Sequence, residues 1–269
     1  VAAQHLNSTT PLDWVGMCGI AMPMQIGGRQ VAATVDAGVN LVDGTTGNGF
    51  NRQAWVGFSG GFGEIKLGKM WNAYDDIVGA TSPLFDSGAL TTNNLAPSYA
   101  LEAGNPGNAV YYATPSFGGV SGAVSTTFKT GETNARVSAF HVKYEGGPLF
   151  VGLAHEQQKD DLSADLKLTR LSASYDFGAA KLLAGYGNVK AGSVKTTDLS
   201  FGADVPLGAN LVLSAGYASS KTDGAERLSG LGLGVAYSLS KRTTVYGGFL
   251  DTKNTGPDTR YGFGLKHTF

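Results

Sequence analysis

The residue types that most often carry catalysis are few and scattered in this sequence. Its single cysteine, Cys18, excludes an internal disulfide framework and a multi-cysteine metal centre. The acids Asp160, Asp161 and Asp165 could hold a divalent cation, but their spacing is not that of a calcium loop. The four histidines have no metal-ligand spacing and no neighbouring nucleophile and carboxylate: His5, His141, His155 and His267. The sequence therefore predicts no catalytic residues, no metal and no cofactor.

A phosphate-binding motif is spelled at Gly63–Lys69, which reads G-x-x-x-x-G-K. A working phosphate loop needs a following Ser or Thr and a strand-to-helix setting. Here Met70 follows, and the segment alternates like a strand. The net charge is −1, from 20 basic and 21 acidic residues, and no basic stripe stands out. We therefore expect neither a bound nucleotide nor a nucleic-acid partner.

The remaining candidate constellation is electrostatic. Its basic members, Arg52, Lys66 and Lys69, are followed directly by residues 71–107, a long irregular stretch with four acids: Asp75, Asp76, Asp86 and Glu102. Alternation puts Lys66 on one face with Glu64, whereas Arg52 and Lys69 share parity with apolar residues. Either a β-bulge re-aims these two side chains, or they lie above the apolar band.

The segments that must position these charges read as strands. In residues 259–269, Tyr261, Phe263 and Leu265 alternate with polar residues or glycine. About ten residues of period-two alternation match a tilted strand that crosses a bilayer. No run reaches the roughly 18 apolar residues of a membrane-spanning helix. The 40 glycines, about twice the usual share, would weaken a soluble sheet and are tolerated in membrane barrels.

Hairpins repeat along the chain with short turns and longer charged loops in alternation. Turns are expected at residues 115–119, 146–148, 177–180, 206–210 and 238–242, and loops at 129–135, 157–165, 190–196, 219–227 and 251–258. In bacterial outer-membrane barrels the short turns are periplasmic and the longer loops extracellular. About fourteen strands follow from residue 27 onward. An open edge in lipid would leave backbone groups unsatisfied, so the sequence predicts an all-β, transmembrane antiparallel β-barrel of about 14 to 16 strands.

The terminal strand with its aromatic last residue, the hairpin at residues 52–69 and the turn at 239–243 resemble the Gram-negative general diffusion porins, in particular their β-proteobacterial branch. The resemblance covers residues 27–269 and lacks the family's usual first strands. It implies an outer-membrane homotrimer surrounded by lipid. It also implies an assembly signal for the barrel assembly machinery, formed by Tyr261, Phe263, Leu265 and Phe269.

The same resemblance implies that residues 71–107 form a third loop folded into the barrel. Arg52, Lys66 and Lys69 would then face the loop acids Asp75, Asp76, Asp86 and Glu102 across the narrowest section. Tyr111 stands where many family members carry another basic residue. The implied function is a passive, water-filled channel for ions and small hydrophilic solutes, and not an enzyme. Alternatives are a barrel that acts as an adhesin or substrate-specific channel, or a soluble all-β binding protein.

Strand parity also predicts a weak ion selectivity that leans toward anions. The basic residues of inward parity outnumber the acidic ones, although the loop acids offset them. The basic set is Lys66, His141, Lys143, Arg170, Arg260 and Lys266, and the acidic set is Glu64, Glu156, Asp176 and Asp204.

Residues 1–26 differ from the rest, because they hold Cys18, Pro23 and a charge-free run without strand alternation. We therefore divide the chain into an atypical segment, residues 1–26, and a barrel, residues 27–269. Three alternatives remain for the seam: residues 1–26 lie outside the wall, they supply two poor strands, or the seam stays open. The first is favoured, and it requires Arg29–Asn40 to pair with the terminal strand.

Overall fold

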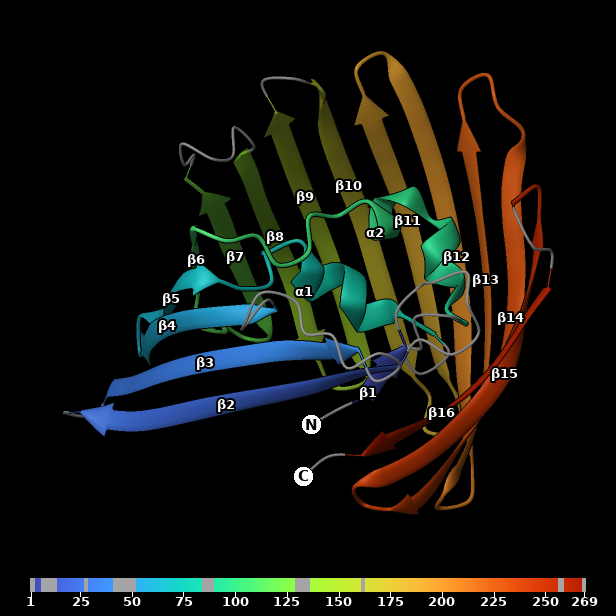
Figure 1. Ribbon diagram of the computed structural model, residues 1–269, viewed down its shortest axis with the longest axis horizontal. Helices are drawn as coiled ribbons and strands as arrows, with labels where there is room; N and C mark the ends of the chain where they lie inside the picture. The colour runs from blue at the N-terminus through green and yellow to red at the C-terminus, as the bar shows by residue number, and fades with distance from the viewer. Residues whose placement is uncertain are drawn as a thin grey trace.

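The described residues of this chain form one antiparallel sheet of sixteen strands in which the strand order follows the chain (Figure 1). The computed structural model describes residues 3–5, 14–26, 29–40, 52–83, 90–128, 136–160, 163–255 and 259–267. The strands are β1 (Ala3–His5), β2 (Trp14–Ile26), β3 (Arg29–Asn40), β4 (Gln53–Gly60), β5 (Gly63–Lys69), β6 (Ala109–Ala113), β7 (Val120–Thr127), β8 (Arg136–Gly146), β9 (Leu149–Asp160), β10 (Ser163–Asp176), β11 (Lys181–Ala191), β12 (Val194–Leu207), β13 (Leu211–Thr222), β14 (Arg227–Ser240), β15 (Thr243–Lys253) and β16 (Thr259–His267).

The two faces of the sheet differ as the alternation predicted. On β10, for example, Leu171 and Tyr175 are exposed on the outer face, whereas Arg170, Ser172 and Ser174 are buried on the inner face. The same apolar exposure recurs on the outer face of β4 to β14 and of β16. An outer face of this kind suits lipid, so the predicted transmembrane β-barrel is confirmed. No helix among the described residues is long and apolar enough to cross a membrane.

The connections lie at two rims. The turn rim carries residues 61–62, 114–119, 147–148, 177–180, 208–210 and 241–242. The described connections on the other side belong to the loop rim, at residues 70–83, 90–108, 192–193, 223–226 and 254–255. Three expected long loops, at residues 157–165, 190–196 and 219–227, are shorter than predicted. The strands before them extend to Asp160, Ala191 and Thr222, and the strands after them begin at Ser163, Val194 and Arg227. Exposed charged side chains are compatible with a paired strand.

The described residues of the long connection, 70–83 and 90–108, fold back inside the sheet, as the sequence predicted (Figure 1). It contains two short α-helices, α1 (Asp75–Val78) and α2 (Pro97–Ala100), and two 3₁₀ turns, η1 (Gly79–Thr81) and η3 (Thr92–Leu95). These elements pack against the inner faces of β8 to β14. The core therefore lies between the loop and the wall, where Tyr74, Ile77, Ala154 and Leu168 are fully buried.

The predicted seam is wrong. β3 pairs along its length with β2, from Val15↔Asn40 to Ile26↔Arg29, and not with the terminal strand. β1 then pairs antiparallel with β2 and lies beside β16. Residues of the first 26 therefore supply two strands, the alternative that was not favoured. The reason is parity, since β2 and β16 run in the same direction and β1 supplies an antiparallel neighbour for both.

Candidate functional site

The charged inner surface between the loop and the wall is the candidate functional site. Lys66, on β5, lies on the inner face, with its Nζ 2.8 Å from Glu64 Oε2. The same Nζ is 4.9 Å from the ring centre of Trp55 and 5.1 Å from that of Tyr111, within the range of cation–π attraction. The Lys66 side chain is 22% exposed. Lys66 is thus held in place by two rings and a carboxylate while it still meets water.

The other two predicted basic residues lie at the loop rim, at the ends of β4 and β5. The Arg52 guanidinium carbon lies 5.2 Å from the ring centre of Trp71 at the base of the loop, and the Arg52 carbonyl accepts a hydrogen bond from Asn105 Nδ2. The β4–β5 register runs from Gly60↔Gly63 to Ala54↔Lys69 without a shift, so no bulge re-aims Lys69. Lys69 keeps the parity of the exposed Leu67 and ends its strand at the loop rim.

The loop acid Asp76 faces the wall. Its Oδ2 accepts a hydrogen bond of 2.7 Å from the Tyr111 hydroxyl and lies 3.5 Å from His141 Nδ1. The same His141 nitrogen lies 2.6 Å from the Ala73 carbonyl oxygen. Tyr111 therefore links the two predicted sets, because Lys66 contacts its ring and Asp76 contacts its hydroxyl. The pattern of residue types did not predict this role for Tyr111.

The acids Asp75 and Glu102 gather with the buried wall residue Glu156, away from Lys66. Glu156 accepts hydrogen bonds from Asn72 Nδ2 at 2.7 Å and from the Ala103 backbone N–H at 2.9 Å. Burial, with the neighbouring Asp75 and Glu156 carboxyls, raises the pKa of Glu102 to about 9. Glu102 is therefore protonated at neutral pH and adds no charge to the passage. Asp86, the fourth predicted loop acid, lies outside the described residues.

A buried ion pair anchors the second half of the loop. Asp198, on β12, accepts hydrogen bonds from the Ser98 backbone N–H at 2.9 Å and from its hydroxyl at 2.7 Å. Arg170, on β10, donates to Ser98 Oγ at 2.9 Å, to Asp198 Oδ1 at 3.3 Å and to Ser200 Oγ at 2.7 Å. The side chains of Arg170 and Asp198 are both 0% exposed. We call Arg170, Asp198 and Ser98 the loop anchor.

Glycine makes room for this anchor. A Cβ at position 185 would lie 2.2 Å from Arg170 Nη2, and a Cβ at position 187 would lie 1.9 Å from Ser98 Oγ. Side chains at positions 185 and 187 of β11 would therefore displace the loop. Parity alone places Arg170 and Asp198 inward, but their partner Ser98 is on an irregular loop, so the sequence did not reveal the anchor.

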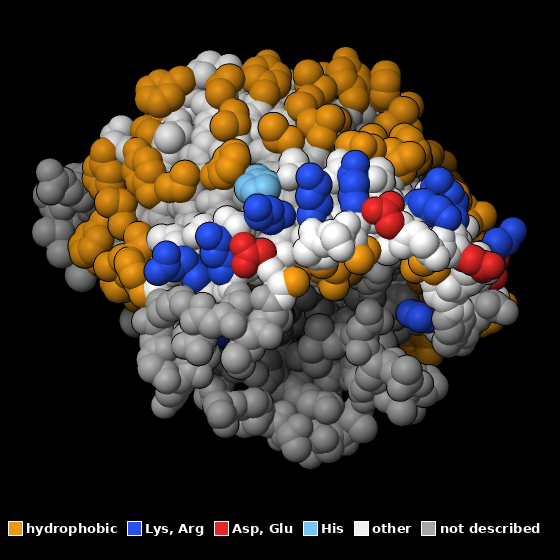
Figure 2. Space-filling model, turned by 90° about the horizontal axis from the view of Figure 1, so that it is seen from above, with side chains coloured by type: hydrophobic (Ala, Val, Ile, Leu, Met, Phe, Trp, Pro, Cys, Tyr) orange, Lys and Arg blue, Asp and Glu red, His pale blue; other side chains and the backbone are white. Residues whose placement is uncertain are grey.

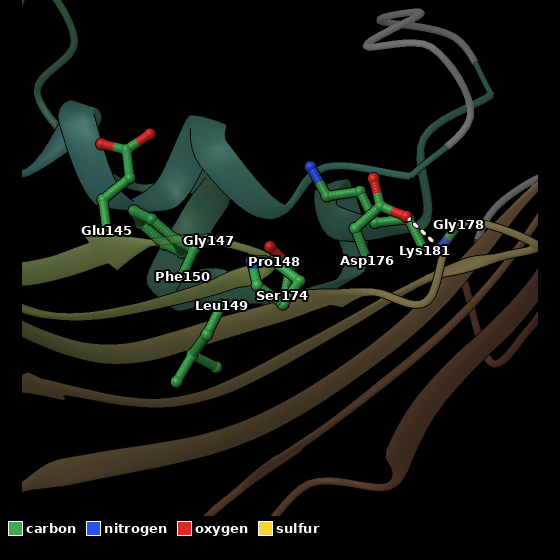
Figure 3. A pocket seen from close by; sticks show the side chains of 9 residues that line it. All are labelled: Glu145, Gly147, Pro148, Leu149, Phe150, Ser174, Asp176, Gly178 and Lys181. Atoms are coloured by element: carbon green, nitrogen blue, oxygen red, sulfur yellow. Dashed lines mark hydrogen bonds between the residues drawn. The ribbon is translucent and has the colours of Figure 1, made fainter.

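At the turn rim the inner surface widens into a charged cavity of about 410 Å³ (Figure 3). Glu145, Asp176 and Lys181 are among the residues that line it. Asp176 accepts a hydrogen bond of 2.7 Å from the Gly178 backbone N–H, and Glu145 lies 3.2 Å from Lys143 Nζ. Both signs of charge therefore line the passage at this end.

Comparison with known proteins agrees with this geometry. Residues 24–257 match the model of the family described as Gram-negative porin. Outer membrane porin protein 32 of Delftia acidovorans is 29% identical over 240 residues, covering 80% of this chain and 67% of that protein. A 46-residue stretch, 17% of the chain, is 61% identical to GTP cyclohydrolase FolE2 of Pseudomonas putida (strain GB-1) and covers 15% of that enzyme.

Solved structures give the same fold. The anion-selective porin from Comamonas acidovorans superposes with a TM-score of 0.80 at 25% identity, covering 94% of this chain and 89% of that one. The trimer form of OmpT of Vibrio cholerae superposes with a TM-score of 0.76 at 17% identity, covering 100% and 96%. The chain therefore belongs to the Gram-negative porin family and is a porin of the bacterial outer membrane.

Proposed function

We propose that this porin is a passive diffusion channel whose narrowest section lies between the infolded loop and the wall formed by β4, β5 and β6. The observation that carries the proposal is the position of the loop. Its anchor fixes it to β10 and β12, and its first half is fixed to β6 and β8 through Tyr111 and His141. Beside the loop, the side chains of Lys66, Glu64 and Asp76 still meet water, at 22%, 36% and 33% exposure.

The charges exposed to water give the channel a weak preference for anions. Arg170 and His141 have inward parity, but both are buried beneath the loop and offer nothing to a passing ion. Glu156 and Asp198 are buried in the same way. Among the remaining inward residues of the wall, the basic ones outnumber the acidic ones: Lys66, Lys143, Lys181, Arg260 and Lys266 against Glu64, Glu145, Asp176 and Asp204. The loop acid Asp76, whose side chain is 33% exposed, keeps the preference weak. Screening over about 8 Å at physiological salt further weakens the preference. The similar porin from Comamonas acidovorans is described as anion-selective, which favours the same sign.

Zero-current reversal potentials across a planar bilayer with a salt gradient test this proposal. We expect a modest anion preference for the parent channel. Lys66→Gln should lower the anion-to-cation permeability ratio by a factor of about two, since it leaves Glu64 unpaired beside the loop. Lys241→Gln, at the turn rim, is the matched control and should leave the ratio unchanged. A strong cation preference in the parent, or an unchanged ratio in Lys66→Gln, would contradict the proposal.

The remaining features concern assembly. We expect a homotrimer, which the trimer form of the OmpT structure favours, and recognition of the last strand by the barrel assembly machinery. Tyr261 and Phe263 support the second expectation, because they are 82% and 77% exposed on the outer face of β16 and are available to another protein. Leu265 is also exposed there, and Phe269 lies outside the described residues.

The chain is proposed not to be an enzyme. Its family model covers residues 24–257, whereas its likeness to a GTP cyclohydrolase covers 15% of that enzyme. Incubation of the refolded protein with GTP should give no turnover above a protein-free blank. GTP-dependent product formation that scales with protein concentration would contradict this expectation.

A further inference from the structure

The cavity at the turn rim holds charges of both signs that are not paired with one another. Lys181, on β11, stands directly opposite Asp176 of β10 and directly opposite Asp204 of β12, so it lies between two carboxylates. Side chains directly opposite in a sheet are about 5 Å apart at Cβ, which is close enough for ion pairs. Among the residues that the structure describes, however, no ion pair involves Lys181.

Each of these two carboxylates accepts from another donor. Asp176 accepts a hydrogen bond of 2.7 Å from the backbone N–H of Gly178, and Asp204 accepts one from the Ser214 hydroxyl. These hydrogen bonds hold the carboxylates in place and leave the ammonium group of Lys181 to the passage. Figure 3 shows Asp176 and Lys181 side by side at one end of the cavity. The cavity therefore offers an acceptor for a cation next to a donor for an anion.

An apolar surface lies beside these charges. Phe150, on β9, and Ser174, on β10, are directly opposite each other, and both line the cavity. Phe150 is thus the diagonal neighbour of Asp176, and such neighbours are about 7–8 Å apart. The Phe150 side chain is partly buried, because it also packs against the core beneath the loop. A volume of about 410 Å³ is within the range of pockets that bind small molecules.

The order of charges around the cavity differs from that on the outside of the molecule. On the face seen in Figure 2, Lys and Arg side chains follow one another along the edge of the hydrophobic surface, with few acidic side chains between them. Around the cavity the signs alternate, because Lys181 has an aspartate on each side. A simple anion is repelled by the aspartates and a simple cation by the lysine. The arrangement therefore favours a solute that carries both charges.

We propose that this cavity is a binding site for an α-amino acid with an apolar side chain. The ammonium group of the solute binds Asp176, its carboxylate binds Lys181, and its side chain lies against Phe150. The spacing fits, because a single carbon atom separates the two charged groups of an α-amino acid, and Asp176 and Lys181 are opposite each other on adjacent strands. The inference rests on the proposed function, since it names a solute class for the same passage.

Calorimetric titration of the refolded full-length protein, in neutral detergent and at neutral pH, tests the inference with three probes of similar size. L-phenylalanine carries both charges, phenylpropionate lacks the ammonium group, and phenylethylamine lacks the carboxylate. Phenylalanine should bind the parent about fivefold more tightly than either of the other probes, since one accessible charge pair contributes a factor of this order. Equal affinity of the parent for the three probes would overturn the inference, whether or not any variant refolds.

Two substitutions should change the preference among the probes in opposite ways. Lys181→Gln removes the partner of the carboxylate, so phenylalanine should lose about fivefold in affinity and phenylethylamine should lose none. Asp176→Asn keeps an acceptor for the Gly178 N–H but removes the partner of the ammonium group. In that variant phenylalanine should lose about fivefold and phenylpropionate none. Lys241→Gln removes a charge at the turn rim outside the cavity and should bind every probe like the parent.

Unchanged phenylalanine affinity in both Lys181→Gln and Asp176→Asn would overturn the inference. So would an equal loss of affinity in the control Lys241→Gln. Because binding is measured without ion flow, its failure leaves the reversal potentials and conductance of the channel as they were. Conversely, a parent channel without anion preference would contradict the proposed selectivity and would not alter the binding of the probes.

Discussion

The two inner walls of this porin use charge in opposite ways. On the wall that carries the loop, Arg170 and Asp198 are fully buried and bonded to each other and to Ser98. On the facing wall, Lys66 has a carboxylate partner and two aromatic neighbours but keeps contact with water. The first kind of charge fixes the shape of the passage, and the second kind acts on the ions within it. The alternation of the sequence places both kinds of charge on the inner face and does not distinguish one kind from the other.

The largest expected effect follows from removal of the anchor arginine. Arg170→Met leaves Asp198 buried without its cation, which costs about 3–5 kcal/mol in comparable buried pairs. We expect that loss in the free energy of unfolding, together with unstable single-channel current from a released loop. Replacement of both partners, in Arg170→Met/Asp198→Leu, should recover part of the stability. Lys181→Met, on the same inner face near the turn rim, is the control and should stay close to the parent.

A smaller effect is expected when the anchor keeps all its polar groups but loses space. In Gly187→Ala the new Cβ would lie 1.9 Å from Ser98 Oγ, so the loop must move away from β11. Conductance should change while the protein still folds. In Gly262→Ala, on the inner face of the opposite wall, the new Cβ would lie 3.5 Å from Leu90, an ordinary contact. Equal conductance of the two variants would show that the close fit at Gly187 does not position the loop.

The smallest effect on conduction at neutral pH concerns Glu102, which adds no charge to the passage. Burial and the neighbouring Asp75 and Glu156 raise its pKa from 4.5 to about 9 in the folded protein. Between these two values the folded state holds a proton that the unfolded state has released, so stability falls as the pH rises from about 4.5 to 9. Glu102→Gln should flatten this part of the profile of unfolding free energy against pH. Below about pH 4.5 the two proteins should be equally stable, because the amide resembles the protonated carboxyl, and at pH 7 Glu102→Gln should be the more stable. If Glu102→Gln leaves the slope of unfolding free energy against pH unchanged, then the cluster of Asp75, Glu102 and Glu156 does not raise the pKa of Glu102.

The sequence predicted the strands well where the alternation is strong. The expected fourteen strands from residue 27 onward correspond to β3 to β16, and the long loop folds inward as expected. β2 was missed because its charge-free run does not alternate and contains Pro23. A proline is tolerated there because it lies at a free edge. β3 pairs with one edge of β2 along its length, and β1 pairs with the other edge only at residues 14–16, so no described strand needs a backbone N–H from Pro23 on that edge.

The site was harder to predict than the wall. Lys66 and Glu64 share a face as parity requires, but the loop acids turn toward Tyr111, His141 and Glu156 and not toward the basic residues. Periodicity is a property of regular strands and gives no orientation for side chains on an irregular loop. The role of Arg52, Lys66 and Lys69 as one basic wall stays a prediction, and the geometry favours Lys66 among them.

The central claim is that the infolded loop sets the width of the channel, and single-channel conductance in a planar bilayer tests it most directly. Deletion of residues 82–93 removes the middle of the loop but keeps α1 and Ser98, so that both fixed ends remain on the wall. The account predicts a higher conductance for the deletion variant than for the parent at the same salt concentration. An unchanged conductance in a correctly folded deletion variant would contradict it.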